Sequence, residues 1–119
     1  MLERSRIAES AVYVHTGATD MRCGFDRLSA MVLEQLHRTV MSGGLYVFLS
    51  RCRRKVKILY WDRDGYAVWH KRLEAGVFRV QTRGGYEEIT GIDLESLLGG
   101  MDFSRIKLRK NAGSGSLHP

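Results

Sequence analysis

The stretch that most constrains the fold runs from residue 48 to residue 72, because it holds the signals of a β-hairpin. In residues 56–61, Val56, Ile58 and Tyr60 alternate with other side chains, which is the period of a strand with two unlike faces. Residues 62–65, Asp-Arg-Asp-Gly, contain Asp and Gly, which tolerate the left-handed backbone conformations of a tight turn. The sequence therefore predicts that residues 66–71 return antiparallel to residues 56–61.

A cluster of cations precedes this hairpin and continues along it. The cations are Arg51, Arg53, Arg54, Lys55, Lys57, Arg63, Lys71 and Arg72, and Arg22 is a further candidate. No acidic residue interrupts residues 51–57, and the net charge of +6 favours polyanionic partners. Clustered Arg and Lys beside aromatic residues suit contact with nucleic-acid phosphates. A solvated turn whose apolar neighbours form the core explains the same pattern, so the residues alone leave both interpretations open.

The aromatic residues of the hairpin suggest a different function. Tyr60, Trp61, Tyr66 and Trp69 would form a patch for docking another protein if they share an exposed surface. Aromatic residues and Arg are the common anchors of protein interfaces. If Trp61 and Trp69 are cross-strand neighbours, however, they could simply pack against the first helix.

The rest of the chain adds short elements on both sides of the hairpin. We expect strands at residues 12–15, 45–49, 77–81 and 86–89, a helix from residue 20 to about residue 37, and a short helix after Thr90. A turn at residues 83–85 should join the last two strands. The predicted fold class is α+β, with a small, mostly antiparallel β-sheet of hairpins packed with one longer N-terminal helix and one short C-terminal helix.

The length and composition allow one domain. A chain of 119 residues with 44% hydrophobic residues can bury one modest core, which we place in residues 11–103. Residues 1–10 are polar and are expected to be loose, and residues 104–119 are expected to form a basic, disordered tail. No apolar stretch approaches the roughly 20 residues of a membrane span, so the sequence predicts a cytoplasmic protein without membrane contact.

The sequence offers little support for catalysis. Asp62 and Asp64 could hold a divalent cation, but a hairpin turn already explains both residues. Cys23 and Cys52 are better interpreted as packing or surface residues than as a disulfide or a nucleophile, and the histidines lack zinc-site spacing. We therefore expect no metal, no cofactor and no enzymatic activity.

Several segments together carry a family resemblance. They are residues 17–22 (Gly-Ala-Thr-Asp-Met-Arg), 24–26, 42–43, 45–48, 57–62 (Lys-Ile-Leu-Tyr-Trp-Asp), 64–65, 69, 71–74 and 92–103. Over about residues 12–104 the chain resembles the TnpB family, the second open reading frame products of the insertion-sequence family numbered sixty-six. These proteins are distinct from the RNA-guided nucleases that share the TnpB name. Cys23 stands where the family commonly has a basic residue, and Gln81 where it commonly has Pro.

The resemblance implies a small, non-catalytic protein that assists a separate transposase, together with another accessory protein. Combined with the basic hairpin, it leads to the hypothesis of a DNA-binding accessory factor, with the ends of the element as candidate DNA. The alternative is a protein-interaction module that docks the transposase or the second accessory protein without contacting DNA. An open strand edge would also allow a homodimer.

Overall fold

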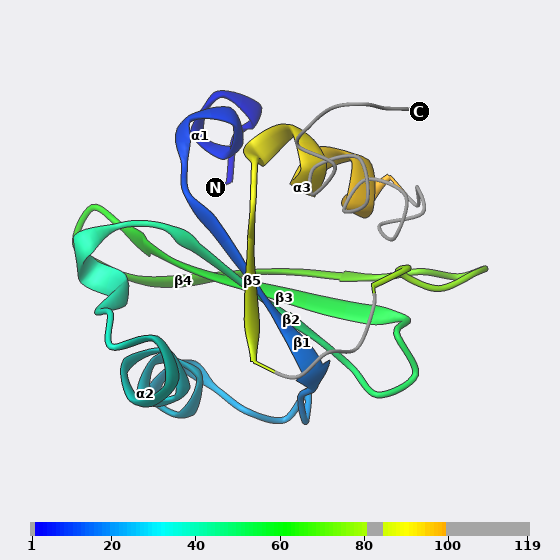
Figure 1. The fold of residues 1–119 in the computed structure, drawn as a ribbon, viewed down its shortest axis with the longest axis horizontal. Helices are drawn as coiled ribbons and strands as arrows, with labels where there is room; N and C mark the ends of the chain where they lie inside the picture. Colours follow the sequence, from blue (N-terminus) through cyan, green and yellow to red (C-terminus); the bar gives the residue numbers. More distant parts are fainter. Residues whose placement is uncertain (1, 81–84, 100–119) are drawn as a thin grey trace.

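The computed structural model describes residues 2–80 and 85–99, which form a five-stranded sheet covered by helices on both faces (Figure 1). The strands are β1 (Val12–Ala18), β2 (Leu45–Leu49), β3 (Lys55–Asp62), β4 (Gly65–Arg72) and β5 (Tyr86–Ile89). The helices are α1 (Arg4–Glu9), α2 (Phe25–Leu36) and α3 (Gly91–Leu98), with a 3-10 turn η1 (Val40–Ser42) before β2. Helices α1 and α3 lie on one side of the sheet and α2 on the other.

The sheet is mixed, and the prediction of a mostly antiparallel sheet of hairpins is wrong. The strand order is β4-β3-β2-β1-β5, and β1 pairs parallel with β2 through a register that begins at Val12 opposite Leu45. Helix α2 makes the crossover that a parallel pair requires. Every residue of β2 is buried, which is typical of a strand covered on both faces.

The β3–β4 hairpin agrees with the sequence prediction. The strands pair antiparallel from Lys55 opposite Arg72 to Asp62 opposite Gly65. Arg63 occupies the left-handed region of the turn, with a φ of 60°. The hairpin is therefore closed by the tight turn that the Asp-Arg-Asp-Gly sequence indicates.

The N-terminal segment, expected to be loose, contains helix α1. Ile7 is buried beneath it, and α1 packs so closely on α3 that a Cβ atom on Gly91 would lie 2.0 Å from the Ile7 carbonyl oxygen. The sequence does not indicate this helix, because Ile7 is its one large apolar residue. Its order comes from tertiary packing and not from helical periodicity.

The other helices follow the predicted patterns with shifted boundaries. Helix α2 begins after Gly24, later than the predicted start at residue 20, because residues 20–23 form a turn. Its buried residues, Leu28, Met31 and Val32, have the three- and four-residue spacing of one helix face. The predicted helix after Thr90 is confirmed as α3, and the Thr90 hydroxyl caps it by accepting a hydrogen bond from the Asp93 N–H.

The segment after the hairpin differs from the prediction. Residues 77–80 form no strand and contain an isolated bridge at Arg79, although Phe78 is buried. The predicted strand at residues 86–89 exists as β5, but it pairs with β1. Residues 81–84 and 100–119, which include most of the predicted turn at 83–85, the end of the predicted domain and the predicted tail, lie outside the described residues. Among the helices that are described, none is long and apolar enough to cross a membrane.

The sheet separates two hydrophobic cores and so decides which way each hairpin residue points. Val56, Ile58 and Tyr60 face the core beneath α1 and α3, whereas Leu59 and Trp61 face the core beneath α2. Because side chains alternate along a strand, Lys55 and Lys57 emerge on the α2 side.

Candidate nucleic-acid interface

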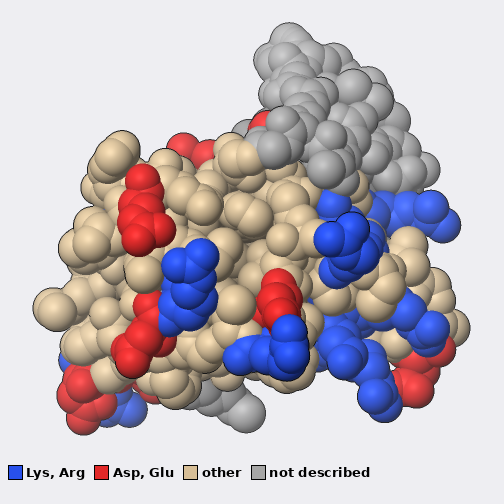
Figure 2. Space-filling view, turned by 90° about the horizontal axis from the view of Figure 1, so that it is seen from below, with Lys and Arg blue, Asp and Glu red and all other residues tan. Residues whose placement is uncertain are grey.

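Cations gather on the α2 side of the hairpin, at the end away from the 62–65 turn. Lys55 lies directly opposite Arg72, and Lys57 directly opposite His70. We call this region the cationic end, and it comprises Arg51, Arg54, Lys55, Lys57, His70 and Arg72. Figure 2 shows Lys and Arg gathered over one part of this face, whereas charges of both signs lie over the other part.

The electrostatics of the cationic end reflect this crowding. Burial lowers the pKa of His70, and the charges of Lys57 and Lys55 lower it further. Arg72 pairs with Glu74 at 3.1 Å, and the Arg54 guanidinium donates to the Glu74 carbonyl oxygen at 2.9 Å. Glu74 is thus an acid that offsets part of the positive charge.

Lys57 also has a structural task. Its ammonium donates to the carbonyl oxygens of Met21 at 2.7 Å and Cys23 at 3.0 Å, which fastens the loop before α2 to the sheet. Lys57 therefore contributes charge to the cationic end while most of its donors serve the fold.

Arg22 lies in that loop and extends from the surface. It contacts both carboxylate oxygens of Asp20, at 3.1 Å from Nε to Oδ1 and 2.7 Å from Nη2 to Oδ2. Hydrogen bonds from the Arg22 side chain and backbone lower the pKa of Asp20 to about 2. Asp20 consequently stays ionised and holds Arg22 in place.

The other predicted cations lie apart from the cationic end. Arg53 is half-buried and donates to the Thr16 carbonyl oxygen at 2.9 Å, and burial lowers its pKa. Arg63 is at the opposite turn of the hairpin. Lys71 points to the other side of the sheet, where its ammonium donates to the Leu98 carbonyl oxygen at 3.1 Å. The structure thus separates these three cations from the cationic end, Lys71 by the alternation of side chains along β4 and Arg53 and Arg63 by their places in the turns.

The predicted aromatic patch is likewise divided between the two sides of the sheet. Trp61 lies opposite Tyr66, with ring centroids 5.2 Å apart, and both are on the α2 side. Tyr60 is 3% exposed and, like Trp69, packs on the α1 and α3 side. Because Trp69 lies opposite Ile58, the two tryptophans are not cross-strand neighbours.

One aromatic surface keeps Trp61 and Tyr66 of the predicted patch and adds a residue from the start of α2. Phe25 stacks on Tyr66 with ring centroids 6.4 Å apart, and these residues are 47% and 40% exposed. Phe25, Trp61 and Tyr66 therefore form one cluster, which we call the aromatic end. A large apolar residue within a predicted amphipathic helix is expected to face the core, so the exposure of Phe25 could not be predicted.

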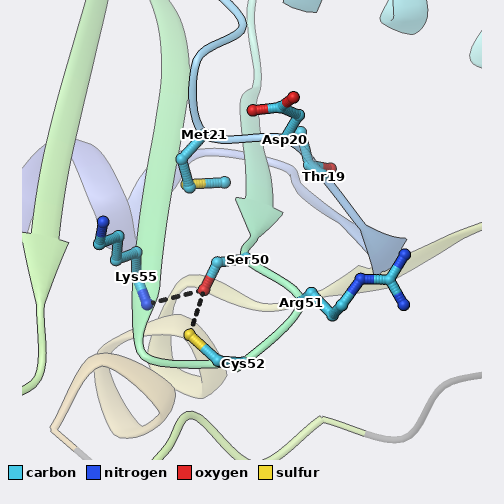
Figure 3. Close-up of a pocket in the computed structure, with 7 residues that line it drawn as sticks. All are labelled: Thr19, Asp20, Met21, Ser50, Arg51, Cys52 and Lys55. Atoms are coloured by element: carbon cyan, nitrogen blue, oxygen red, sulfur yellow. Dashed lines mark hydrogen bonds between the residues drawn. The ribbon is translucent and has the colours of Figure 1, made fainter.

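A pocket of about 380 Å³ lies where the parallel strands β1 and β2 both end (Figure 3). Thr19, Asp20 and Met21 line it from the loop after β1, Ser50, Arg51 and Cys52 from the turn after β2, and Lys55 from the start of β3. Sequence reasoning missed this site because it did not recognise the parallel pair. The available signal was a strand, a helix and then a continuously apolar strand, an order that is typical of a parallel pair. Ligands often bind at the carboxyl ends of such strands.

The cysteine of this pocket is exposed and electrostatically perturbed. The Ser50 hydroxyl lies 3.5 Å from the Cys52 sulfur and, with the Arg54 backbone N–H and the nearby Arg54 charge, lowers the pKa of the thiol. The Ser50 hydroxyl also accepts a hydrogen bond from the Lys55 backbone N–H at 3.0 Å. Across residues 2–80 and 85–99 there is no group of three or more His, Cys, Asp and Glu side chains able to hold a metal ion.

Comparison with known proteins identifies the family. The family model described as IS66 Orf2 like protein matches residues 10–108. The uncharacterized protein y4hO of Sinorhizobium fredii is 38% identical over 93 residues, which cover 77% of this chain and 81% of that protein. The uncharacterized protein y4jC of the same organism is 28% identical over 97 residues, 81% of this chain and 83% of that protein. No solved structure matches the chain significantly. Because the family model spans most of the sequence, the chain belongs to the IS66 Orf2-like family.

Proposed function

We propose that this protein is a non-catalytic accessory factor of insertion-sequence transposition that binds DNA through the cationic end. Family membership supports the role in transposition. The observation that carries the DNA contact is the cross-strand pairing of Lys55 with Arg72. Like charges directly opposite each other destabilise a sheet, and a bound polyanion would relieve that repulsion.

The arrangement suits phosphates better than bases. Arg51, Arg54 and Arg72 are exposed, and they occupy a turn and the neighbouring strand end without forming a helix or ribbon that projects into a groove. Contacts of this kind give affinity and orientation more than sequence choice. Recognition of the element's ends would then come from the cognate transposase or from the shape of the DNA.

Fluorescence anisotropy of labelled duplex DNA tests the proposal. One probe carries the terminal repeat of the parent element and the other a scrambled sequence, and both are titrated at several salt concentrations. Arg51→Glu should weaken binding to both probes by roughly tenfold at low salt and reduce the salt slope by about one. Arg53 is unsuitable for this test because its guanidinium supports the backbone at Thr16.

Arg4→Glu is the matched control, since it makes the same charge change on α1, at the other side of the sheet. It should alter affinity by less than about twofold, because exposed charges act mainly within a Debye length. Equal losses from the two variants would show a general charge effect and refute the cationic end as the contact. No binding of either probe at low salt would refute DNA binding altogether.

A second candidate function rests on the aromatic end. Phe25 and Tyr66 are large, exposed and in contact with each other, as the anchors of a protein interface often are. The proposed partner is the cognate transposase or the second accessory protein. Tyr66→Ser should abolish capture of that partner in a pull-down while circular dichroism shows an intact fold, and undiminished capture would argue that the aromatic end serves packing alone.

Two further expectations also remain proposals. β4 lies at an edge of the sheet, so a second copy of the chain could pair with it to form a homodimer. Sedimentation equilibrium over a range of protein concentrations would reveal such a dimer. A role in transposition fits a cytoplasmic location, where the DNA of a bacterial cell lies, and cell fractionation tests it.

A further inference from the structure

The pocket at the ends of β1 and β2 adjoins the cationic end and shares two of its residues, Arg51 and Lys55. Its volume of about 380 Å³ is near the lower limit of the roughly 300–1,000 Å³ typical of small-molecule sites. A second hollow of about 400 Å³ adjoins it and shares Thr19, Asp20 and Arg51. The surface beside the cations is therefore indented and not flat.

The wall of the pocket is mainly apolar, in contrast to its surroundings. Met21 and Cys52 approach it from opposite sides of Ser50 (Figure 3). The Ser50 hydroxyl is already engaged with the Lys55 N–H and the Cys52 thiol. A ligand would thus meet polarizable sulfur and carbon surfaces, which suit a flat aromatic ring.

Cations stand on either side of this apolar wall. Figure 3 shows the side chains of Arg51 and Lys55 extending in opposite directions away from the pocket. A ring seated between them would have a positive charge on each flank. This combination matches one nucleotide within a strand, whose base carries a phosphate on both its 5′ and 3′ sides.

Asp20 adds an acceptor at the rim. Its carboxylate is fixed by Arg22, and hydrogen bonds from Arg22 keep it ionised by lowering its pKa to about 2. An ionised carboxylate accepts hydrogen bonds from the amino groups of bases, as Asp and Glu do with cytosine. The Arg22 charge offsets the repulsion between Asp20 and the DNA backbone.

We infer that this pocket receives a single unpaired nucleobase of the bound DNA, with Arg51 and Lys55 contacting the phosphates on either side. The inference rests on the proposed function, because it requires that the cationic end bind DNA. It extends that function by naming the preferred DNA: a strand with an unpaired base, as at a bulge, a gap or an opened end. A fully paired duplex would reach the cations and leave the pocket empty, since its bases remain stacked.

Two duplexes of identical sequence, one carrying a single extra unpaired base, provide the test. In fluorescence anisotropy we expect the bulged duplex to bind about tenfold more tightly, in keeping with the contribution of one stacked base. Cys52 supplies a second readout, because its exposed thiol can be alkylated with N-ethylmaleimide and the modified peptide quantified by mass spectrometry. The bulged duplex should slow alkylation of Cys52 by about fivefold or more, and the paired duplex by less than about twofold.

The Cys23→Ser variant alkylated at Cys52 before the titration gives the matched comparison, because the adduct would occupy the pocket and leave the cations in place. It should bind both duplexes with the affinity that the untreated protein has for the paired one. Equal, salt-dependent binding of the two duplexes with unprotected Cys52 would overturn the pocket inference and leave the proposed function intact. Absence of binding to both at low salt would overturn both.

Discussion

The two ends of the β3–β4 hairpin present different chemistry on the same side of the sheet. Near the 62–65 turn, Trp61 and Tyr66 pair across the strands and meet Phe25 of α2. At the other end, Lys55 and Lys57 lie opposite Arg72 and His70. The Leu59–Val68 pair separates the two regions and packs beneath α2.

This difference shows which of the two ends is explained by contacts within the chain. The aromatic end is already satisfied within the chain, because Phe25 of α2 stacks on Tyr66 and Trp61 donates from its indole to the Arg63 carbonyl oxygen. The pairing of Lys55 with Arg72 is unfavourable for the isolated sheet, although Glu74 offsets part of it. A charge arrangement that opposes stability is better evidence of an external partner than a packed aromatic cluster is.

The largest effect on stability is expected at Leu59, which lies between the aromatic end and the cationic end and supports both. Leu59→Ala should lower the free energy of unfolding by about 2–4 kcal/mol, because a fully buried side chain is truncated and leaves a cavity. Urea denaturation followed by circular dichroism measures this. The exposed Leu33 of α2 is the control, and Leu33→Ala should change stability by less than about 0.5 kcal/mol. Similar losses in the two variants would mean that Leu59 is not part of a shared core.

Replacing Lys57 should cause a smaller loss of stability, because this cation supports the fold. Lys57→Met removes the hydrogen bonds to the Met21 and Cys23 carbonyl oxygens, and we expect it to destabilise the fold by about 1–3 kcal/mol. The same denaturation experiment measures the change. If the variant is as stable as the native protein, the loop before α2 does not depend on this cation, and Lys57 is then available to DNA.

The parts of the fold that local sequence determines were predicted well. The turn at residues 62–65 and the Thr90 cap depend on the backbone preferences and hydrogen bonds of a few adjacent residues. The parallel pairing of β1 with β2 depends on which distant strands meet, and a two-residue period is the same in either direction. Helix α1 was missed for a related reason, because it is held by its contact with α3.

The candidate site was predicted in composition but not in arrangement. Clustered cations could be read from residues 51–57, whereas the direction of each side chain required the register and the position of α2. Lys71 illustrates the limit, since it is adjacent to Arg72 in sequence but reaches Leu98 on the opposite side of the sheet. The pocket was missed because its two loops are neighbours only through the parallel pair, which the predicted antiparallel sheet did not contain.

Removing one charge of the Lys55–Arg72 pair should have opposite effects on stability and on DNA binding. Lys55→Gln is expected to stabilise the protein by about 0.2–1 kcal/mol, because a like-charge pair with Arg72 is lost. The same variant should weaken DNA binding and reduce the salt slope by about one. Denaturation and anisotropy measured on one preparation test both effects. A variant that loses stability would show that Lys55 serves the fold and would weaken the case for an external polyanion.

The smallest expected effect is a pH dependence of DNA binding through His70. Burial and the charges of Lys57 and Lys55 lower the pKa of this imidazole from the ordinary value of 6.5, so it is neutral at pH 7.5 in the unbound protein. A phosphate nearby would favour the imidazolium and raise the pKa in the complex. Binding then takes up a proton, so affinity should increase, by about two- to threefold, as the pH falls from about 7.5 to 6.

Anisotropy titrations at constant ionic strength measure this dependence, and His70→Gln should remove it. His37 provides the control because it lies in the left-handed region at the end of α2, with a φ of 57°, which Asn tolerates. His37→Asn should therefore keep both the fold and the pH dependence. If His70→Gln retains the dependence, His15 is the next residue to vary, since burial also lowers its pKa and it lies in β1, outside the cationic end. That result would show that the His70 imidazole does not lie against the bound phosphates.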